Sequence, residues 1–311
     1  MQKEVFINFV SERLQDITGY EVRVHEVPKN NGLVLTGLTI VRENRNAYPT
    51  IYLDNYYEDY QAGRDMESIV REIKRTDEKY QVAEDFDITC FTDFNKVKAN
   101  LYYKIINLEA NSERLQNIPH KPILDFAKVY YVEIKNEILG NGTILIANEH
   151  MKQWGVTAEE LDTIATANTE IKLHPSVREM SENINLKLSE MLGDMKEDGE
   201  VPEDATMPDL SHIQYPDMYV VSNQKGYYGA TTLVYKGFLK VASEVVEDDL
   251  VIFPSSIHEF IFMPANTVER DYHELKEIVE SINATALDKE EFLSNNVYFY
   301  NRFTDELTII D

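Results

Sequence analysis

Four side chains capable of catalysis or metal binding lie within five residues, at Ser255, Ser256, His258 and Glu259. They separate two apolar runs of β type, at 250–253 and 260–263. Burying such groups costs about 1–3 kcal/mol each unless they find hydrogen-bond partners. The segment therefore either completes a polar network between two strands or contributes to a functional site.

A serine hydrolase is the first chemistry to consider. On a regular strand Ser256 and His258 would share one face with Cα atoms about 6.6 Å apart, and Glu259 would lie on the other face. A hydrogen bond from Ser256 to His258 would be strained, and Glu259 could not orient the imidazole as a triad acid does. No G-x-S-x-G motif surrounds Ser255 or Ser256. A bend that satisfies its own polar groups is the favoured interpretation, and a hydrolase using Ser255 or Ser256 with His258 is an alternative.

Metal and cofactor motifs are incomplete. His258-Glu259 begins like the H-E-x-x-H motif of zinc proteases, but Phe262 stands where the second histidine is needed. Gly140-Asn141-Gly142 lacks the third glycine of a dinucleotide fingerprint, and no phosphate-binding G-x-x-x-x-G-K-[ST] loop is present. The sequence predicts no metal site and no cofactor.

A second polar segment covers 223–230 and leads from a predicted strand into a predicted helix. A turn at such a place can present backbone amides to an anion, although a structural turn is the simpler interpretation. This segment and the bend at 254–259 flank the same predicted helix, so they could meet at one end of a sheet. We expect a ligand-binding surface formed by Asn223, Lys225, Gly229, Ser256 and His258.

The formal net charge is −25, from 30 Lys and Arg against 55 Asp and Glu. Such a surface repels phosphate backbones, so direct nucleic-acid contact and binding to anionic membranes are not expected. No stretch approaches the ~18 apolar residues of a membrane span. The charge fits either cytosolic solubility or an acidic inhibitor that mimics nucleic acid towards a DNA-processing protein, but no long regular row of acids is visible.

The single cysteine, Cys90, excludes an intramolecular disulfide and a thiolate metal cluster. Its apolar neighbours predict a packed side chain rather than a nucleophile. The first residues contain no apolar stretch of signal-peptide length. These features together predict a cytoplasmic protein.

Hydrophobic periodicity and turn residues predict an α+β fold with mixed, mainly antiparallel sheets and packed helices. Predicted helices cover 3–18, the tyrosine-rich segment from Asp54 to Gly63, a segment around 66–73, a segment from Thr157, and 175–192, 231–243 and 268–282. Predicted strands cover 20–27, 33–41, 49–53, 101–108, 121–134, 142–147, 218–222, 250–254, 257–263, 296–301 and 307–310. Segment 193–216 is rich in acids, glycine and proline and is predicted to be a mobile loop. We expect residues 1–311 to form one continuous module, with two lobes at about 1–192 and 217–311 as the alternative.

Several of these segments occur in an order that resembles one bacterial family. They are Pro28-Lys29-Asn30-Asn31-Gly32, Pro49-Thr50-Ile51-Tyr52-Leu53, Met218-Tyr219 with Asn223, Gly229-Ala230, and Phe253-Pro254-Ser255-Ser256-Ile257-His258-Glu259. The chain resembles, over nearly its whole length, a domain-of-unknown-function family frequent in gut Firmicutes. The resemblance implies a bacterial, cytosolic protein built as one module, and it implies no activity.

We therefore expect a binding or interaction protein rather than an enzyme, with an unknown protein or a small molecule as its partner. The serine–histidine hydrolase and the acidic inhibitor of a DNA-processing protein are the two alternatives.

Overall fold

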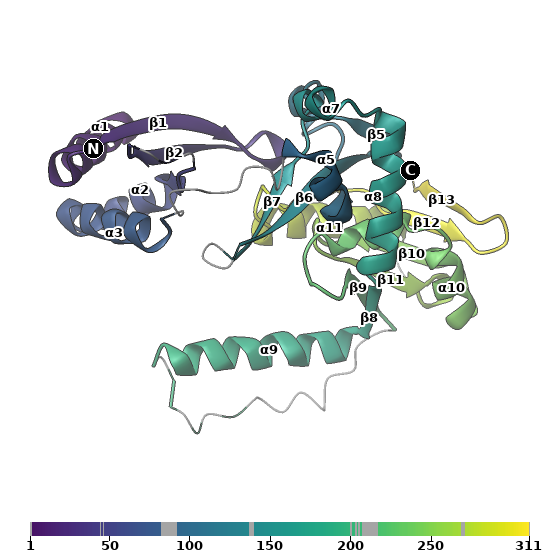
Figure 1. The fold of residues 1–311 in the computed structure, drawn as a ribbon. Coiled ribbons are helices and arrows are strands. Elements are labelled where there is room, and N and C mark those ends of the chain that lie inside the picture. Colours follow the sequence, from purple (N-terminus) through teal and green to yellow (C-terminus); the bar gives the residue numbers. More distant parts are fainter. Residues whose placement is uncertain are drawn as a thin grey trace. The chain divides into compact units, whose positions relative to one another are not determined.

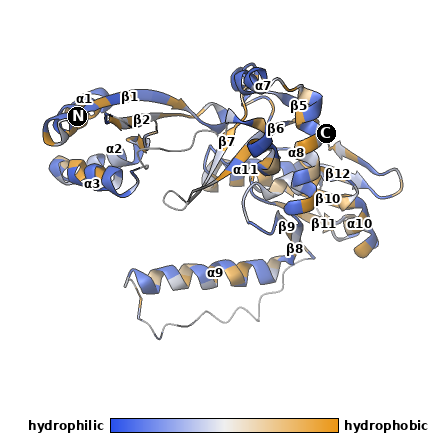
Figure 2. Cartoon of the chain, in the orientation of Figure 1, coloured by the Kyte–Doolittle hydropathy of each residue, from blue (hydrophilic) through white to orange (hydrophobic). Residues whose placement is uncertain are grey.

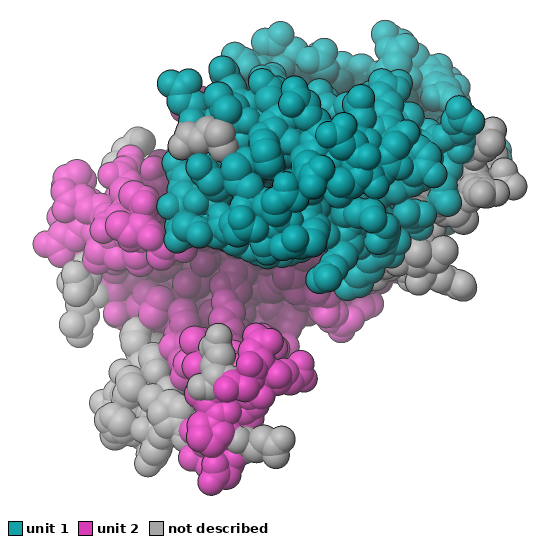
Figure 3. Space-filling view, turned by 90° about the vertical axis from the view of Figure 1, so that its left-hand side faces the viewer, with its two compact units in different colours: residues 1–101, 110–118, 131–158 teal, residues 102–109, 119–130, 159–311 magenta. Residues whose placement is uncertain are grey.

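The computed structural model describes residues 2–310 except 44, 46, 82–91, 137–139, 200, 203, 205, 207–216 and 269–270 (Figure 1). Its contacts divide the chain into two compact units, which Figure 3 shows in separate colours. Unit 1 comprises residues 1–101, 110–118 and 131–158, and unit 2 comprises 102–109, 119–130 and 159–311. The segment expected to separate two lobes, 193–216, falls in the range of unit 2, and the number of domains stays a prediction.

Unit 1 begins with α1 (Lys3–Thr18), which buries one apolar stripe. Phe6, Val10 and Leu14 are fully buried because residues four apart share a helix face. Gly19 ends the helix with a φ of 72°, a conformation that glycine adopts at little cost. The stripe packs in a core with residues of the following strands and helices.

A three-stranded antiparallel sheet follows α1 in unit 1, in the order β1–β2–β3. Its strands are β1 (Glu21–Pro28), β2 (Val34–Val41) and β3 (Ile51–Tyr52). Two helices complete its core, α2 (Asp54–Gln61) and α3 (Met66–Lys79). These elements match the predicted ones to within a few residues.

Loop 29–33 joins β1 to β2 and includes the short 3₁₀ helix η1 (Asn30–Gly32). Asn31 and Gly32 have φ values of 58° and 65°, which confirms the hairpin chemistry expected of these residues. The Asn31 amide donates to Asn111 Oδ1 at 2.9 Å, and Asn111 Nδ2 donates to Asn31 Oδ1 at 2.8 Å. Because both side chains are buried, this pair fastens the hairpin to a segment distant in sequence.

The remaining described elements of unit 1 are short. They are α5 (Phe94–Val97), η2 (Lys98–Asn100), α6 (Ser112–Leu115), β7 (Gly140–Leu145) and α7 (Asn148–Trp154). The strand β6 (Phe126–Asn136) belongs to both units. Its first part pairs with β5 (His120–Ile123) in unit 2, and its residues 131–136 pair with β7 in unit 1.

Unit 2 is built around a six-stranded sheet with the order β13–β12–β10–β11–β9–β8, in which all neighbours are antiparallel. Its strands are β8 (Pro175–Glu179), β9 (Tyr219–Asn223), β10 (Leu250–Pro254), β11 (Phe260–Pro264), β12 (Tyr298–Asn301) and β13 (Glu306–Ile309). Alternate residues of β10 enter two different cores: Leu250 and Ile252 enter one, and Val251 and Phe253 the other. Both faces of the sheet centre are therefore covered.

The other elements of unit 2 are β4 (Leu101–Asn107, of which Leu101 belongs to unit 1), α8 (Ala158–Lys172), α9 (Met180–Glu197), η3 (Gly229–Val234), α10 (Phe238–Val245), η4 (Ala265–Thr267) and α11 (Tyr272–Ala286). Helix α11 contributes Val279 to the core that contains Val251, and α10 and η3 line the opposite core. Figure 2 shows apolar and polar residues interspersed along α9, on which Leu186 and Met191 are exposed.

The predicted α+β class is confirmed, and three element predictions are wrong. The run 121–134 is not one strand, because Leu124 adopts a φ of 53° and turns the chain between β5 and β6. The helix predicted at 231–243 is divided into η3 and α10, and Gly237 has a φ of 74° between them.

The third correction concerns the helix predicted at 175–192. Residues 175–179 pair with β9 instead, and the helix that follows continues through Gly193 to Glu197. Pairing with a distant strand therefore overrides the local helical pattern. Residues 207–216 of the predicted acidic loop lie outside the described residues, as does Cys90.

Candidate functional site

The serine–histidine–glutamate segment is the loop of a hairpin in unit 2. Pro254 of β10 pairs with Phe260 of β11, which leaves residues 255–259 to close the turn. The Ser256 amide donates to the Glu259 carbonyl at 3.0 Å, and the His258 amide donates to Ser256 Oγ at 2.9 Å. Ser256 is only 7% exposed, so its hydroxyl serves the loop itself.

His258 connects this loop to the turn that follows β9. Its Nδ1 accepts the Tyr228 amide at 3.0 Å, and its carbonyl accepts the Ser222 hydroxyl at 2.8 Å. The imidazole also stacks on the Tyr228 ring, with centroids 5.7 Å apart and an interplanar angle of 8°. Because Nδ1 accepts a hydrogen bond, the neutral ring carries its proton on Nε2.

The Nε2 atom of His258 faces Glu291, whose Oε1 is 3.6 Å away. Burial lowers the pKa of His258 below its usual value, and nearby Lys104 acts in the same direction, while Glu291 and Glu259 oppose the shift. His258 is therefore neutral at pH 7, as its contact with the Tyr228 amide requires.

Gly229 allows the turn 223–228 and the loop 255–259 to approach each other. A Cβ atom there would lie 2.1 Å from Ser222 Oγ and 2.6 Å from both the Asn223 amide nitrogen and the His258 carbonyl oxygen. The turn before it is shaped by Asn223, whose Oδ1 accepts the Lys225 amide at 2.9 Å. Only a residue without a side chain fits at position 229.

A group of lysines and tyrosines surrounds the same turn, and we call it the lysine–tyrosine surface. It consists of Tyr102, Lys104, Lys172, Lys225, Tyr227 and Tyr228, all in unit 2. Lys104 Nζ lies 3.7 Å from the centroid of the Tyr228 ring, on which His258 also stacks. Tyr227 and Tyr228 contact each other edge to face, with centroids 4.9 Å apart.

The lysine contacts continue from Tyr227 to Tyr102, which is only 4% exposed. Lys225 Nζ lies 6.0 Å from the Tyr227 centroid and 5.5 Å from that of Tyr102, and Lys172 Nζ lies 5.8 Å from the latter. Such distances are typical of cation–π contacts, which hold the lysine side chains over the rings. In a chain with nearly twice as many acids as bases, this gathering of cations departs from the average surface.

The structure thus brings together Asn223, Gly229, Ser256 and His258, which the sequence had singled out. Lys225 lies at the same turn, directed towards the tyrosine rings. Ser255 is half-buried at the start of the loop, and Glu259 forms an ion pair with Lys187 of α9 at 2.9 Å. Lys104, Lys172 and the tyrosines are not among the site residues predicted from the sequence. Alternation along β4 places Tyr102 and Lys104 on one face, but no local pattern links them to Lys225.

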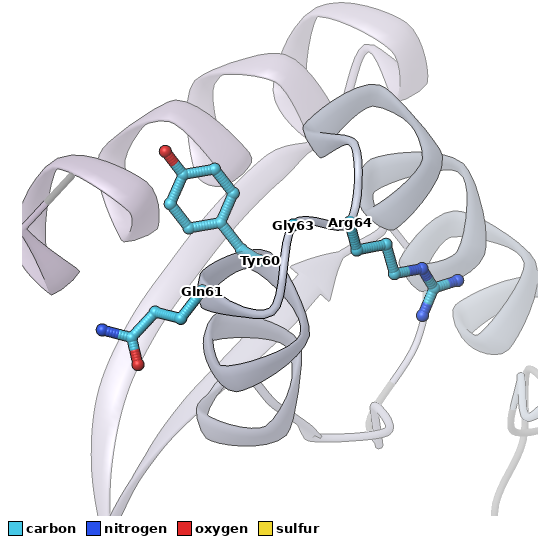
Figure 4. A pocket seen from close by; sticks show the side chains of 4 residues that line it. All are labelled: Tyr60, Gln61, Gly63 and Arg64. Carbon is cyan, nitrogen blue, oxygen red and sulfur yellow. The ribbon is translucent and has the colours of Figure 1, made fainter.

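A depression on the surface of unit 1 is a weaker candidate for a functional site. It is lined by Tyr60, Gln61, Gly63 and Arg64 at the turn between α2 and α3 (Figure 4). The side chains of Gln61 and Arg64 point away from each other in Figure 4, and Arg64 forms ion pairs with Asp59 and Glu72. Polar groups do not converge there, so we place the candidate site in unit 2.

Within the residues that the structure describes, no group of three or more His, Cys, Asp or Glu side chains could hold a metal ion. In the same part of the chain, no helix combines the length and apolar character that crossing a membrane requires.

The chain belongs to a family of unknown function, DUF5688, whose model matches residues 3–302. The match covers nearly the whole chain, as the resemblance implied. No curated protein and no solved structure matches the chain.

Proposed function

We propose that this protein is a binding protein, and that unit 2 holds a small anionic ligand at the lysine–tyrosine surface. One observation carries the proposal: Lys104 of β4, Lys172 of α8 and Lys225 lie over tyrosine rings, beside a turn that contacts with His258 and the close packing at Gly229 hold in place. A turn fixed in this way holds Lys225 and the rings of Tyr227 and Tyr228 in place before a ligand arrives, which reduces the entropic cost of binding.

Binding is favoured over catalysis by the contacts of the loop 255–259. The Ser256 hydroxyl accepts the His258 amide, and the two ring nitrogens of His258 face the Tyr228 amide and Glu291. A nucleophilic serine needs a neighbouring base directed at its hydroxyl. In this structure the same groups hold two loops together instead.

Charge favours a small ligand over a large polyanion. The net charge of −25 repels an extended nucleic acid, whereas a small anion can confine its contacts to the lysines. From the sequence we further expect the protein to act in the cytosol of a bacterium, where small anionic metabolites are abundant.

Thermal denaturation of the full chain tests the proposal. We expect at least one of citrate, orthophosphate and tripolyphosphate to raise the melting temperature in a saturable manner, since a ligand that binds only the native state stabilises it. Lys225→Gln should reduce this increase, whereas Lys236→Gln, at an exposed lysine elsewhere in unit 2, should retain it in full. If none of the anions stabilises the protein, or if both variants respond alike, the proposal is wrong.

The hydrolase alternative has its own test. Labelling of Ser255 or Ser256 by a fluorophosphonate probe would favour a nucleophilic serine over our proposal. The acidic-inhibitor alternative predicts that the chain co-purifies with a basic DNA-processing protein and is released at about 0.5 M salt, where screening is strong.

A further inference from the structure

The cations of the lysine–tyrosine surface do not all lie over the same ring. Lys172 and Lys225 both lie over Tyr102, and Lys104 lies over Tyr228. Tyr227, in edge-to-face contact with Tyr228 and within 6.0 Å of Lys225 Nζ, connects the two groups. The positive charges are therefore shared among three rings.

We infer that the ligand of this surface is a short oligophosphate chain, either an inorganic polyphosphate or the phosphate chain of a nucleotide. This inference rests on the proposed function and specifies its ligand class. Three lysines over more than one ring match a ligand that carries several anionic groups along a chain. Lysine ammonium groups bind phosphate oxygens as point charges without a fixed planar geometry.

Other anions match these lysines less well. A single orthophosphate offers only one phosphoryl group to cations that lie over different rings. A planar carboxylate is better recognised by the paired donors of arginine, and the surface contains lysines instead. A long nucleic acid would extend beyond the lysines over the acidic remainder of the chain.

Isothermal titration calorimetry on the full chain tests the ligand class, at low salt (about 50 mM) because screening weakens such contacts. The titrants are tripolyphosphate, ATP, orthophosphate and citrate, with EDTA present to remove divalent cations. We expect tripolyphosphate and ATP to bind, and orthophosphate and citrate to bind at least about tenfold more weakly. Tighter binding of ATP would identify a nucleotide, and equal or tighter binding of tripolyphosphate would identify the inorganic chain.

Single substitutions locate the site. Lys104→Gln, Lys172→Gln and Lys225→Gln should each weaken tripolyphosphate binding about tenfold, the effect of one lost charge-assisted hydrogen bond, and Lys236→Gln should leave it unchanged. Lys172 and Lys225 are exposed, so their removal should preserve the fold, which circular dichroism checks.

The outcomes separate the two proposals. If citrate binds in a manner that depends on Lys225 and tripolyphosphate does not, the oligophosphate inference is overturned and the binding function survives. If none of the titrants binds, both fail. If Lys236→Gln weakens tripolyphosphate binding as much as Lys225→Gln does, the attraction is diffuse and the assigned surface is wrong.

Discussion

Two hairpin loops of five residues, one in each unit, fasten a distant segment through polar side chains. Loop 29–33 uses a reciprocal pair of hydrogen bonds between Asn31 and Asn111, both neutral and buried. Loop 255–259 uses His258, whose ring is half-buried and can change charge. The contacts of the first loop do not depend on pH, whereas those of the second loop include a titratable group beside the lysine–tyrosine surface.

The difference shows how a polar loop can be assigned a role. The Asn31 and Asn111 amides satisfy each other's hydrogen-bonding groups, so a contribution to stability is sufficient to explain loop 29–33. In loop 255–259, Ser256 and His258 are also satisfied, but their contacts position a turn that carries Lys225 and the tyrosines. We therefore assign the function to the lysines and tyrosines beside loop 255–259, and a structural role to Ser256 and His258.

The largest loss of stability is expected from a substitution that disrupts the packing of loop 255–259. Gly229→Ala places a methyl group 2.1 Å from Ser222 Oγ, so the turn must move away from the His258 carbonyl. We expect a loss of about 3 kcal/mol in the free energy of unfolding, measured by urea denaturation. Gly193→Ala in α9 is the matched control, because nothing lies within 4 Å of its added Cβ and alanine favours helix by about 1 kcal/mol. Equal stabilities of the two variants would contradict the close packing at Gly229.

A somewhat smaller loss of stability is expected when the contacts of loop 29–33 are removed. Asn111→Ala leaves the Asn31 amide and side chain without these buried partners, which should cost about 2 kcal/mol in the same assay. The loss should be the same at pH 5 and pH 8, since neither group titrates in that range. Asn95→Ala, at an exposed position, is the control and should change stability little. A pH-dependent loss for Asn111→Ala would remove the distinction between the two loops.

The pH dependence of loop 255–259 sharpens the comparison. The pKa of His258 is lowered in the folded state, chiefly by burial, so the unfolded chain binds this proton more readily. The stabilisation is complete above the unfolded value of about 6.5 and is lost as the pH falls towards the lowered folded pKa. His258→Asn keeps an acceptor near the position of Nδ1 and does not titrate. Between pH 7 and pH 5 the wild type should therefore lose more stability than this variant, by urea denaturation. Parallel losses would show that His258 does not respond to pH.

The smallest effect concerns the ion pair between Lys187 of α9 and Glu259. Lys187 is 58% exposed, so solvent screens the pair and its removal should cost no more than about 0.5 kcal/mol. Lys187→Ala should also leave tripolyphosphate binding unchanged, because this lysine is not part of the lysine–tyrosine surface. A large loss of stability or binding would mean that α9 is part of the site.

The sequence predicted most elements because their signals are local. The stripe of Phe6, Val10 and Leu14, the Asn-Gly chemistry of loop 29–33 and the apolar runs at β10 and β11 are each contained in a few neighbouring residues. It failed at Leu124, because leucine rarely adopts the left-handed conformation and its apolar side chain reads as part of a strand, and at 175–179, where a distant strand decides the conformation.

For the candidate site, the sequence by itself determined which polar residues stand in the turn 223–228 and in the loop 255–259, and that the chain as a whole is acidic. Only the tertiary structure decided that His258 accepts a hydrogen bond from the Tyr228 amide, and that Lys104 and Lys172 join Lys225 around the tyrosine rings. The physical reason is that cation–π contacts and hydrogen bonds act over a few ångströms in space, whereas these residues are separated by tens of residues along the chain.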